Sequence, residues 1–242
     1  RQLQPKFLMS DRLLALQLYY SALMSIFKPK ILITAGDPLG IGPEIAVKAA
    51  RSAVLRRVVD IFIVGDLPSL RLAGWSQRLC PALAVNAAGL DRSKNRPAAA
   101  AGLASYKAVL AAARLLKTGA FNALVTAPVC KAAWRLAEAG YTAHTDLFRA
   151  LEKKEPQMIF SRGKLNAALV TEHLPLKALP RNITRSLITE KAELFNGALK
   201  RLGIKKPRIA VCALNPHAGD CGLLGREEID AISPALKRLK AR

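Results

Sequence analysis

The sequence predicts an α/β fold with a mostly parallel sheet that is covered by helices on both faces. Short apolar runs of strand length alternate along the chain with longer segments whose apolar residues recur every three or four positions. Glycine or proline stands at several of the junctions between them. Such alternation is typical of βα units in a parallel sheet. With 242 residues, the chain can bury a core in one large domain or two small ones.

In the first half of the chain, each element is predicted from a signal in its own residues or in the residues next to it. Lys30–Ala35 is a β-branched apolar run, which indicates a buried strand, and a glycine-rich turn follows it. Pro43 then stands at a favoured first helical position. Ala98–Lys117 has apolar residues at helical spacing and is stopped by Gly119. The full prediction is strands over Lys30–Ala35, Val58–Val64, Leu83–Val85 and Ala123–Thr126, and helices over Pro43–Arg51, Ala98–Lys117 and Cys130–Ala139.

The second half continues the pattern, with one antiparallel pair. Met158–Phe160 and Ala167–Val170 are predicted to pair around the turn Arg162-Gly163-Lys164. A further strand is predicted over Arg208–Ala213. The predicted helices are His144–Lys153, Thr189–Leu202 and Arg226–Leu239, with Thr142 as a candidate cap of the first.

Residues 1–23 are predicted to be an extension outside the domain, and residues 24–242 to form the α/β region. Phe7–Phe27 is fairly apolar, but Asp11 and Arg12 interrupt it and leave too few residues to span a bilayer. A signal peptide would need a small-residue cleavage site, which does not follow. Met24 would make a natural start just before the first strand, so intact-mass analysis of the native protein checks this expectation.

The net charge of +21 raises the question of a nucleic-acid partner. The lysines and arginines occur in nearly every segment, without a long basic run and without interleaved aromatic residues. We therefore interpret them as solvated helix-surface charges and do not expect a nucleic acid or a membrane as partner. The four cysteines contain no Cys-x-x-Cys pair, which favours a reduced, cytoplasmic protein.

The three histidines all lie in short polar stretches of active-site character. His144 lies in Thr-Ala-His-Thr-Asp, His173 in Thr-Glu-His-Leu-Pro and His217 in Asn-Pro-His-Ala-Gly-Asp. His173 and His217 each follow an apolar run of strand character, and ligands bind beyond the carboxyl ends of strands in open α/β sheets. Because neutral imidazole is the commonest metal ligand, we predict that His173 and His217 share a divalent metal.

Three other patterns have alternative interpretations. The turn Gly36–Gly42 could cradle an anion with the amides of Gly40 and Gly42, or it could be a tight strand-to-helix turn. Lys131 follows a predicted strand and could hold a phosphate or carboxylate, or act catalytically by tuning a proton transfer.

The third pattern is a possible zinc site of Cys212, His217 and Cys221. Its spacing matches no common structural zinc pattern. We expect instead that Cys212 points into the core from its strand.

Taken together, five stretches resemble the 4-hydroxythreonine-4-phosphate dehydrogenase family of pyridoxal phosphate biosynthesis. The resemblance runs in order from Ile31 to about Leu239. The stretches are Gly36-Asp37-Pro38-Leu39-Gly40-Ile41-Gly42-Pro43-Glu44, Thr126-Ala127-Pro128 with Lys131, Gly140-Tyr141-Thr142-Ala143-His144-Thr145, His173-Leu174-Pro175-Leu176 and Asn215-Pro216-His217-Ala218-Gly219-Asp220.

The resemblance implies a fold similar to isocitrate and isopropylmalate dehydrogenases, in a cytoplasmic homodimer. It implies oxidation of 4-phosphooxy-L-threonine (4-hydroxythreonine 4-phosphate) by NAD or NADP and decarboxylation to 3-amino-2-oxopropyl phosphate, in pyridoxine 5'-phosphate biosynthesis. By motif, His173 and His217 are two of three ligands to a divalent metal (zinc, cobalt, magnesium or manganese), and His144 and Thr145 bind substrate.

The sequence also departs from the family. The family's third metal histidine and later substrate-binding residues lie beyond the Asn-Pro-His stretch, and this sequence ends before them. We therefore expect residues 1–242 to bind metal weakly and to show no measurable turnover. Two rival functions are a related dehydrogenase of four-carbon sugar-acid phosphates (threonate or erythronate 4-phosphate) and a non-catalytic, basic nucleic-acid-binding fragment, whose affinity would fall steeply with salt.

Overall fold

The computed structural model describes residues 28–93 and 96–241, which fall into two compact units divided after Leu147. The predictions for residues 1–23, including the apolar stretch up to Phe27, lie outside the described residues. Each unit is described by itself below.

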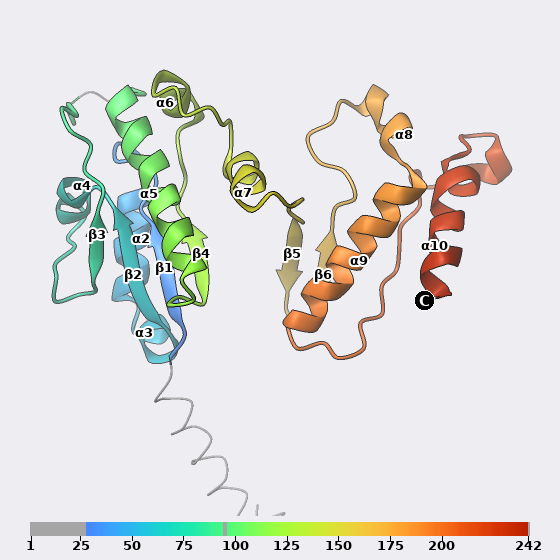
Figure 1. The fold of residues 1–242 in the computed structure, drawn as a ribbon, viewed down its shortest axis with the longest axis horizontal. Coiled ribbons are helices and arrows are strands. Elements are labelled where there is room, and N and C mark those ends of the chain that lie inside the picture. The colour runs from blue at the N-terminus through green and yellow to red at the C-terminus, as the bar shows by residue number, and fades with distance from the viewer. Residues whose placement is uncertain (1–27, 94–95, 242) are drawn as a thin grey trace, which may run out of the picture. The chain divides into compact units, whose positions relative to one another are not determined.

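The first unit is built on a four-stranded parallel sheet (Figure 1). Its strands are β1 (Lys30–Thr34), β2 (Asp60–Gly65), β3 (Ala82–Ala84) and β4 (Ala123–Thr126), in the order β3-β2-β1-β4. The central strand β1 pairs in parallel with both β2 and β4. The β-branched run at Lys30–Ala35 therefore forms the centre of the sheet, as predicted, because only a strand covered on both faces can bury so many apolar residues.

Helices cover both faces of this sheet, which confirms the predicted fold class. Ile33 and Ile63 pack on one face with Val47 and Leu70 of α2 and α4. On the other face, Leu32 and Val64 pack with α5 through Ala108 and Ala112. The helices of this part of the chain are α2 (Gly42–Arg51), α3 (Ala53–Val58), α4 (Leu67–Leu72), α5 (Ala99–Lys117), α6 (Lys131–Leu136) and α7 (His144–Glu152).

Helix α5 is long and apolar enough to cross a membrane by length and composition alone. The same helix lies against the sheet through the buried Ala108 and Ala112, and its Ala101 and Ala104 are also buried. Its apolar character is therefore explained by packing within the first unit.

The second unit combines a hairpin with helices. Strands β5 (Ile159–Arg162) and β6 (Leu165–Ala168) pair antiparallel around Gly163, as predicted. Ile188 of α9 packs with Ala231, Ile232 and Ala235 in the core of this unit. Its helical elements are η1 (Leu176–Ala178), α8 (Leu179–Asn182), α9 (Arg185–Arg201), η2 (Asp220–Gly222), η3 (Glu228–Ile232) and α10 (Ser233–Lys240).

The strand predicted over Arg208–Ala213 is wrong: this segment forms no strand. Its residues alternate between half-buried and exposed up to Cys212, as a strand would. A strand also needs a neighbour to accept its backbone hydrogen bonds, and none of the other described segments pairs with this one. The expectation that Cys212 points into the core is wrong for the same reason, because its side chain is exposed.

The contact between α5 and α6 depends on Gly102. A Cβ at Gly102 would overlap the carbonyl oxygen of Ala133, so the two helices approach as closely as their backbones allow. We expect Gly102→Ala to lower the free energy of unfolding by about 1–3 kcal/mol, as overpacking usually does.

Gly197 provides a matched control for Gly102. It is also inside a helix, but the nearest atom to a Cβ there would be Arg201 Nη1, at 3.9 Å. Gly197→Ala should therefore stabilise its unit, by roughly 0.5–1 kcal/mol, through helix propensity. Urea unfolding followed by far-UV circular dichroism measures both; a stabilising Gly102→Ala would contradict the packing described for α5 and α6.

Candidate functional site

The first two motifs meet at the carboxyl edge of the parallel sheet. Asp37, after β1, donates its backbone N–H to the carbonyl of Pro128, after β4, at 3.0 Å. Gly36 has φ +73°, and a Cβ at this position would overlap the same carbonyl. The glycine turn and the loop that leads to Lys131 are therefore packed directly against each other, at the edge where ligands bind in open α/β sheets.

The glycine turn itself is explained by its own packing. The amide of Gly40 donates to the carbonyl of Asp37 at 3.0 Å, and Asp37 Oδ1 accepts from the amide of Leu39 at 2.8 Å. A Cβ at Gly42 would overlap the carbonyl of Ala35. These contacts favour the tight strand-to-helix turn over the anion cradle, since the Gly40 amide already has an acceptor.

Asp66, which directly follows β2, is a buried carboxylate that sequence reasoning did not single out. Arg92 Nη2 lies 2.6 Å from its Oδ2, and the amides of Ser69 and Ala87 donate to its two oxygens. Burial acts to raise the pKa of Asp66, but the hydrogen bonds from Ala87, Ser69 and Arg92 together outweigh it and lower the pKa. Because its oxygens are engaged in this way, we assign Asp66 a structural role: it caps α4 and holds the loop that contains Arg92.

His144 lies at the start of α7, against a buried aromatic cluster. Its ring meets the Trp134 indole edge-on, with centroids 5.6 Å apart. Trp134 is fully buried and donates from Nε1 to Ser105 Oγ at 2.9 Å, and the Tyr106 ring also meets it edge-on. Thr142 donates to Asp146 Oδ2 across the first turn of α7, close to the predicted capping role. The predicted substrate-binding residue His144 is thus held by a rigid neighbour.

Burial lowers the pKa of His144 below its usual value of 6.5, because the charged imidazolium loses its hydration. We expect an NMR titration to place the pKa of His144 below 6.5. Since the unfolded chain binds this proton more readily, His144 should destabilise the fold progressively as the pH falls below 6.5 and approaches its lowered pKa. A measured pKa at or above 6.5 would show that the ring is more hydrated than its packing on Trp134 implies.

The neighbours of His144 among the predicted site residues lie in the same unit. Thr145 is half-buried in the first turn of α7, directly after His144. Lys131 is exposed and opens α6, where Cys130 caps the helix by accepting from the amide of Ala133 at 3.4 Å. The proton-transfer role of Lys131 stays a prediction.

His173 and His217 belong to the second unit, and both side chains are exposed. The backbone of His173 has φ +53°, in the left-handed region that non-glycine residues seldom adopt. Such outliers persist only where the surrounding structure holds them, and they are concentrated at functional sites. This strain is consistent with a functional role for the loop.

The loop around His217 shows the unusual backbone angles that its Asn, Pro and Gly content indicates. Ala218, Gly219, Asp220, Cys221 and Gly222 all have positive φ, from 42° to 99°. Asn215 Oδ1 accepts from the amides of His217 at 3.0 Å and Gly219 at 3.2 Å. Asn215 therefore fixes the backbone on both sides of the histidine.

Glu228 is a second residue that holds this loop, and sequence reasoning missed it. Its Oε1 accepts from the amide of Leu214 at 2.8 Å, and its Oε2 is buried next to Gly219. The only sequence signal is an acidic pair at the start of the last helical segment, which is also typical of helix N-termini. Its contact with Leu214 spans 14 residues, which local patterns do not reveal.

The segments before the two histidines face a common space. Thr171, two residues before His173, and Leu214, three residues before His217, line one cavity of about 210 Å³. Two imidazoles are suitable ligands for zinc, cobalt or nickel, but structural zinc needs four ligands. Among the described residues, no three His, Cys, Asp or Glu side chains form a metal-binding group, and this includes the alternative of Cys212, His217 and Cys221. A cation shared by His173 and His217 therefore stays a prediction, in which these two side chains would be two of its ligands.

Comparisons with known proteins agree with these motifs. The model of the family described as pyridoxal phosphate biosynthetic protein PdxA matches residues 46–242. A 4-hydroxythreonine-4-phosphate dehydrogenase of Thioalkalivibrio sulfidiphilus is 37% identical, over 88% of this chain and 70% of its own. A relative from Bradyrhizobium diazoefficiens, named "Putative D-threonate 4-phosphate dehydrogenase", is 34% identical, over 86% of this chain and 66% of its own. The chain thus spans about two thirds of the length of these curated relatives.

A solved structure agrees as well. The 4-hydroxythreonine-4-phosphate dehydrogenase of Klebsiella pneumoniae superimposes with a TM-score of 0.78 at 30% identity, covering 89% of this chain and 71% of that one. Family, relatives and fold agree: the chain belongs to the pyridoxal phosphate biosynthetic protein PdxA family.

Proposed function

We propose that this protein acts as a 4-hydroxythreonine-4-phosphate dehydrogenase in pyridoxine 5'-phosphate biosynthesis. The substrate's secondary alcohol loses a hydride to NAD(P)⁺ and a proton, and the resulting β-keto acid loses carbon dioxide to give 3-amino-2-oxopropyl phosphate. The observation that carries this proposal is the family match over residues 46–242. This range includes the candidate site residues Lys131, His144, Thr145, His173 and His217. Seven of the eight curated relatives compared carry this enzyme's name, which favours it over the sugar-acid phosphate alternative.

His173 and His217 are proposed to hold a divalent cation. When bound, the cation and the nicotinamide supply charge stabilisation at the substrate oxygen and a hydride acceptor. Asn215 and Glu228 fix the backbone that carries His217, so its imidazole needs little ordering before it binds. The identity of the metal, and the choice of NAD or NADP, belong to this proposal.

His144 and Thr145 are proposed to bind the substrate. Because burial lowers the pKa of His144, its ring is neutral at neutral pH and can donate from one nitrogen while it accepts at the other. The Trp134 indole limits the orientations of this ring, which favours a single bound geometry for the substrate. We also propose that the substrate is a phosphorylated small molecule, that the full-length form is a homodimer and that the protein is cytoplasmic.

A substrate panel tests the proposed function. Isothermal titration of residues 1–242 should show tighter binding of 4-phosphooxy-L-threonine than of D-threonate 4-phosphate or erythronate 4-phosphate, and His144→Ala should weaken it. Because the chain spans about two thirds of its relatives, turnover is assayed by NAD(P)H absorbance both in residues 1–242 and in a fusion to the remaining third of the Thioalkalivibrio relative. We expect turnover only in the fusion. A consistent preference for a sugar-acid phosphate would replace the proposed substrate.

A further inference from the structure

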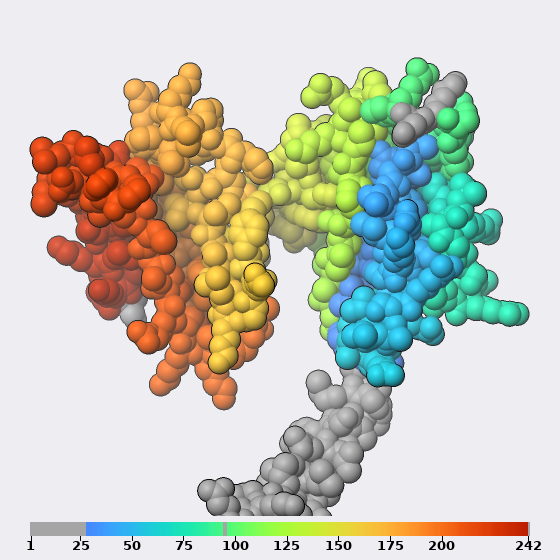
Figure 2. Space-filling view, turned by 180° about the vertical axis from the view of Figure 1, so that it is seen from behind, coloured from blue at the N-terminus to red at the C-terminus, as the bar shows by residue number. Residues whose placement is uncertain are grey.

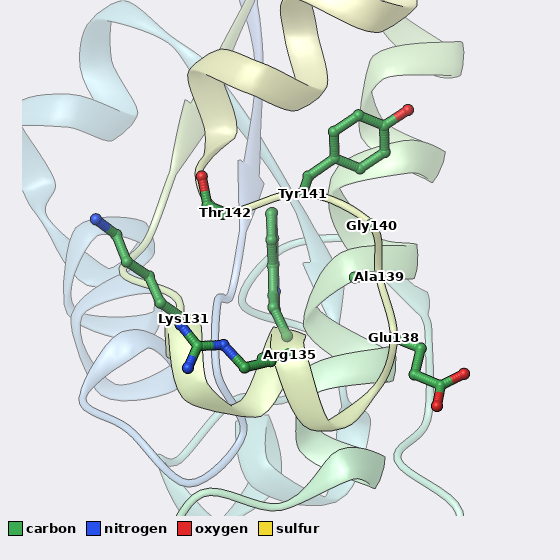
Figure 3. A pocket seen from close by; sticks show the side chains of 8 residues that line it. Lys131, Arg135, Glu138, Ala139, Gly140, Tyr141 and Thr142 are labelled. Carbon is green, nitrogen blue, oxygen red and sulfur yellow. The ribbon is translucent and has the colours of Figure 1, made fainter. Parts of the chain in front are cut away.

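A pocket of about 390 Å³ lies in the first unit between one face of α6 and the loop over residues 138–142 (Figure 3). Its volume is within the range of about 300–1,000 Å³ that is typical of small-molecule sites. None of the predicted site residues except Lys131 lines it. Gly140, Tyr141 and Thr142 of the lining belong to a stretch that identifies the family, but no binding role has been assigned to them or to Arg135.

Two cations share one side of the pocket. Lys131 and Arg135 are four residues apart on α6, so they lie on the same helix face. In Figure 3, both side chains extend to the same side, whereas Glu138 points away from them. No carboxylate of residues 28–93 or 96–241 forms an ion pair with either cation. Like charges at this spacing are mutually unfavourable, and a bound anion would reverse that effect.

The rest of the pocket is rigid and largely apolar. Trp134 is fully buried, and its only N–H donor is used by Ser105. The ring of Tyr141 stacks on Tyr106, with centroids 6.2 Å apart. Thr142 donates its hydroxyl hydrogen to Asp146, so it has none to offer a ligand. The charged donors of the pocket are therefore Lys131 and Arg135, set beside a fixed aromatic wall.

We propose that this pocket binds the phosphate group of a small molecule, with Arg135 and Lys131 as its ligands. A guanidinium offers paired N–H donors that match two phosphate oxygens, and an ammonium adds a compact charge. The half-buried ring of Tyr141, held by stacking on Tyr106, gives the remainder of the molecule an aromatic surface to lie on. This assignment takes the anion-holding alternative for Lys131 in place of proton transfer.

The same chemistry could come from a phosphate monoester or from the pyrophosphate of a dinucleotide. Binding is independent of turnover, so the inference stands or falls separately from the proposed reaction. The probes are therefore O-phospho-L-threonine for the monoester, ADP-ribose for the dinucleotide, and inorganic phosphate.

The fluorescence of Trp134 can be used to measure binding in this pocket. It lines the pocket, and the chain's only other tryptophan is Trp75, so Trp75→Phe leaves Trp134 as the sole indole. Fluorescence titrations at fixed ionic strength should saturate with at least one of the three probes. Isothermal titration of the unsubstituted chain with the same probe gives an independent affinity if Trp75→Phe folds poorly.

Substitutions distinguish binding in this pocket from the nonspecific electrostatic attraction of phosphate to a chain with net charge +21. Lys131→Gln and Arg135→Gln should each weaken binding about tenfold or more, as loss of a charged hydrogen bond usually does. Glu138→Gln should leave binding intact or tighten it, because it removes a negative charge from the lining. Arg71→Gln and Lys164→Gln remove exposed charges outside the pocket and should leave binding unchanged.

The outcomes decide the proposal. Tighter binding of ADP-ribose identifies a dinucleotide phosphate as the occupant, and tighter binding of O-phospho-L-threonine identifies a substrate-type monoester. The proposal is overturned if no probe saturates, or if the two control substitutions weaken binding as much as those in the pocket.

Discussion

Replacing Trp134 with alanine should lower the free energy of unfolding by about 3–5 kcal/mol, the usual cost of removing a large buried aromatic side chain. The indole is fully buried between α5 and the start of α7, and it also donates to the buried Ser105 hydroxyl. Its loss leaves a cavity, an unpaired acceptor and a His144 ring without its packing partner. Urea unfolding followed by far-UV circular dichroism measures the effect.

Two further variants show whether the loss of stability is specific to the Trp134 indole. Trp134→Phe keeps part of the ring volume and should cost less than the alanine variant. Trp75→Ala should also cost less, because the Trp75 side chain is only half-buried, although it donates to the Cys80 carbonyl at 3.1 Å. Equal losses for Trp75→Ala and Trp134→Ala would show that Trp134 is not the central packing residue of this region.

Replacing either His173 or His217 with alanine should reduce zinc or cobalt affinity severely. Loss of a residue that only orients a ligand already costs about 10–100-fold in metal affinity, and loss of a ligand should cost more. His144→Ala is the matched control, because it also removes an imidazole but not one of the proposed ligands, and it should leave metal affinity unchanged. Isothermal titration with Zn²⁺ or Co²⁺ measures all three variants.

The double variant strengthens this test. If both imidazoles bind one cation, His173→Ala together with His217→Ala should lose little beyond either single substitution, since one ligand alone holds the metal poorly. Additive losses of equal size would instead indicate two separate sites. Because both histidines are exposed, neither substitution is expected to unfold the second unit.

The first unit was predictable from sequence because its signals are local. Lys30–Ala35 is apolar on both faces, as the centre of a parallel sheet requires, and Ala98–Lys117 has the spacing and the glycine stop of a helix. The short helices α3 and α4 were missed, because six residues give little periodicity; α6 is equally short but was recognised with the help of the glycine at position 140 that follows it. The strand predicted over Arg208–Ala213 failed for the opposite reason: its pattern is right, but a strand also depends on a distant partner.

In the candidate site too, local features could be predicted from the sequence and longer-range contacts could not. The residue types and neighbours of His144, His173 and His217 could be read from short motifs. The residues that hold them could not be read in this way. Trp134 contacts His144 across ten residues, and Glu228 contacts the His217 loop across 14, which is beyond the reach of a short motif. Lys131 and Arg135 share a face by helical spacing alone, but the pocket beside them is formed by the loop that follows α6.

The central claim, that His173 and His217 bind one cation, is tested most directly by NMR of the imidazole signals during a zinc titration. The chain contains only three histidines, so each ring can be assigned by substitution. We predict that the signals of His173 and His217 shift along one common binding curve with a single zinc per chain, while those of His144 stay in place. Separate curves for His173 and His217, or a zinc response from one of them alone, would contradict the account.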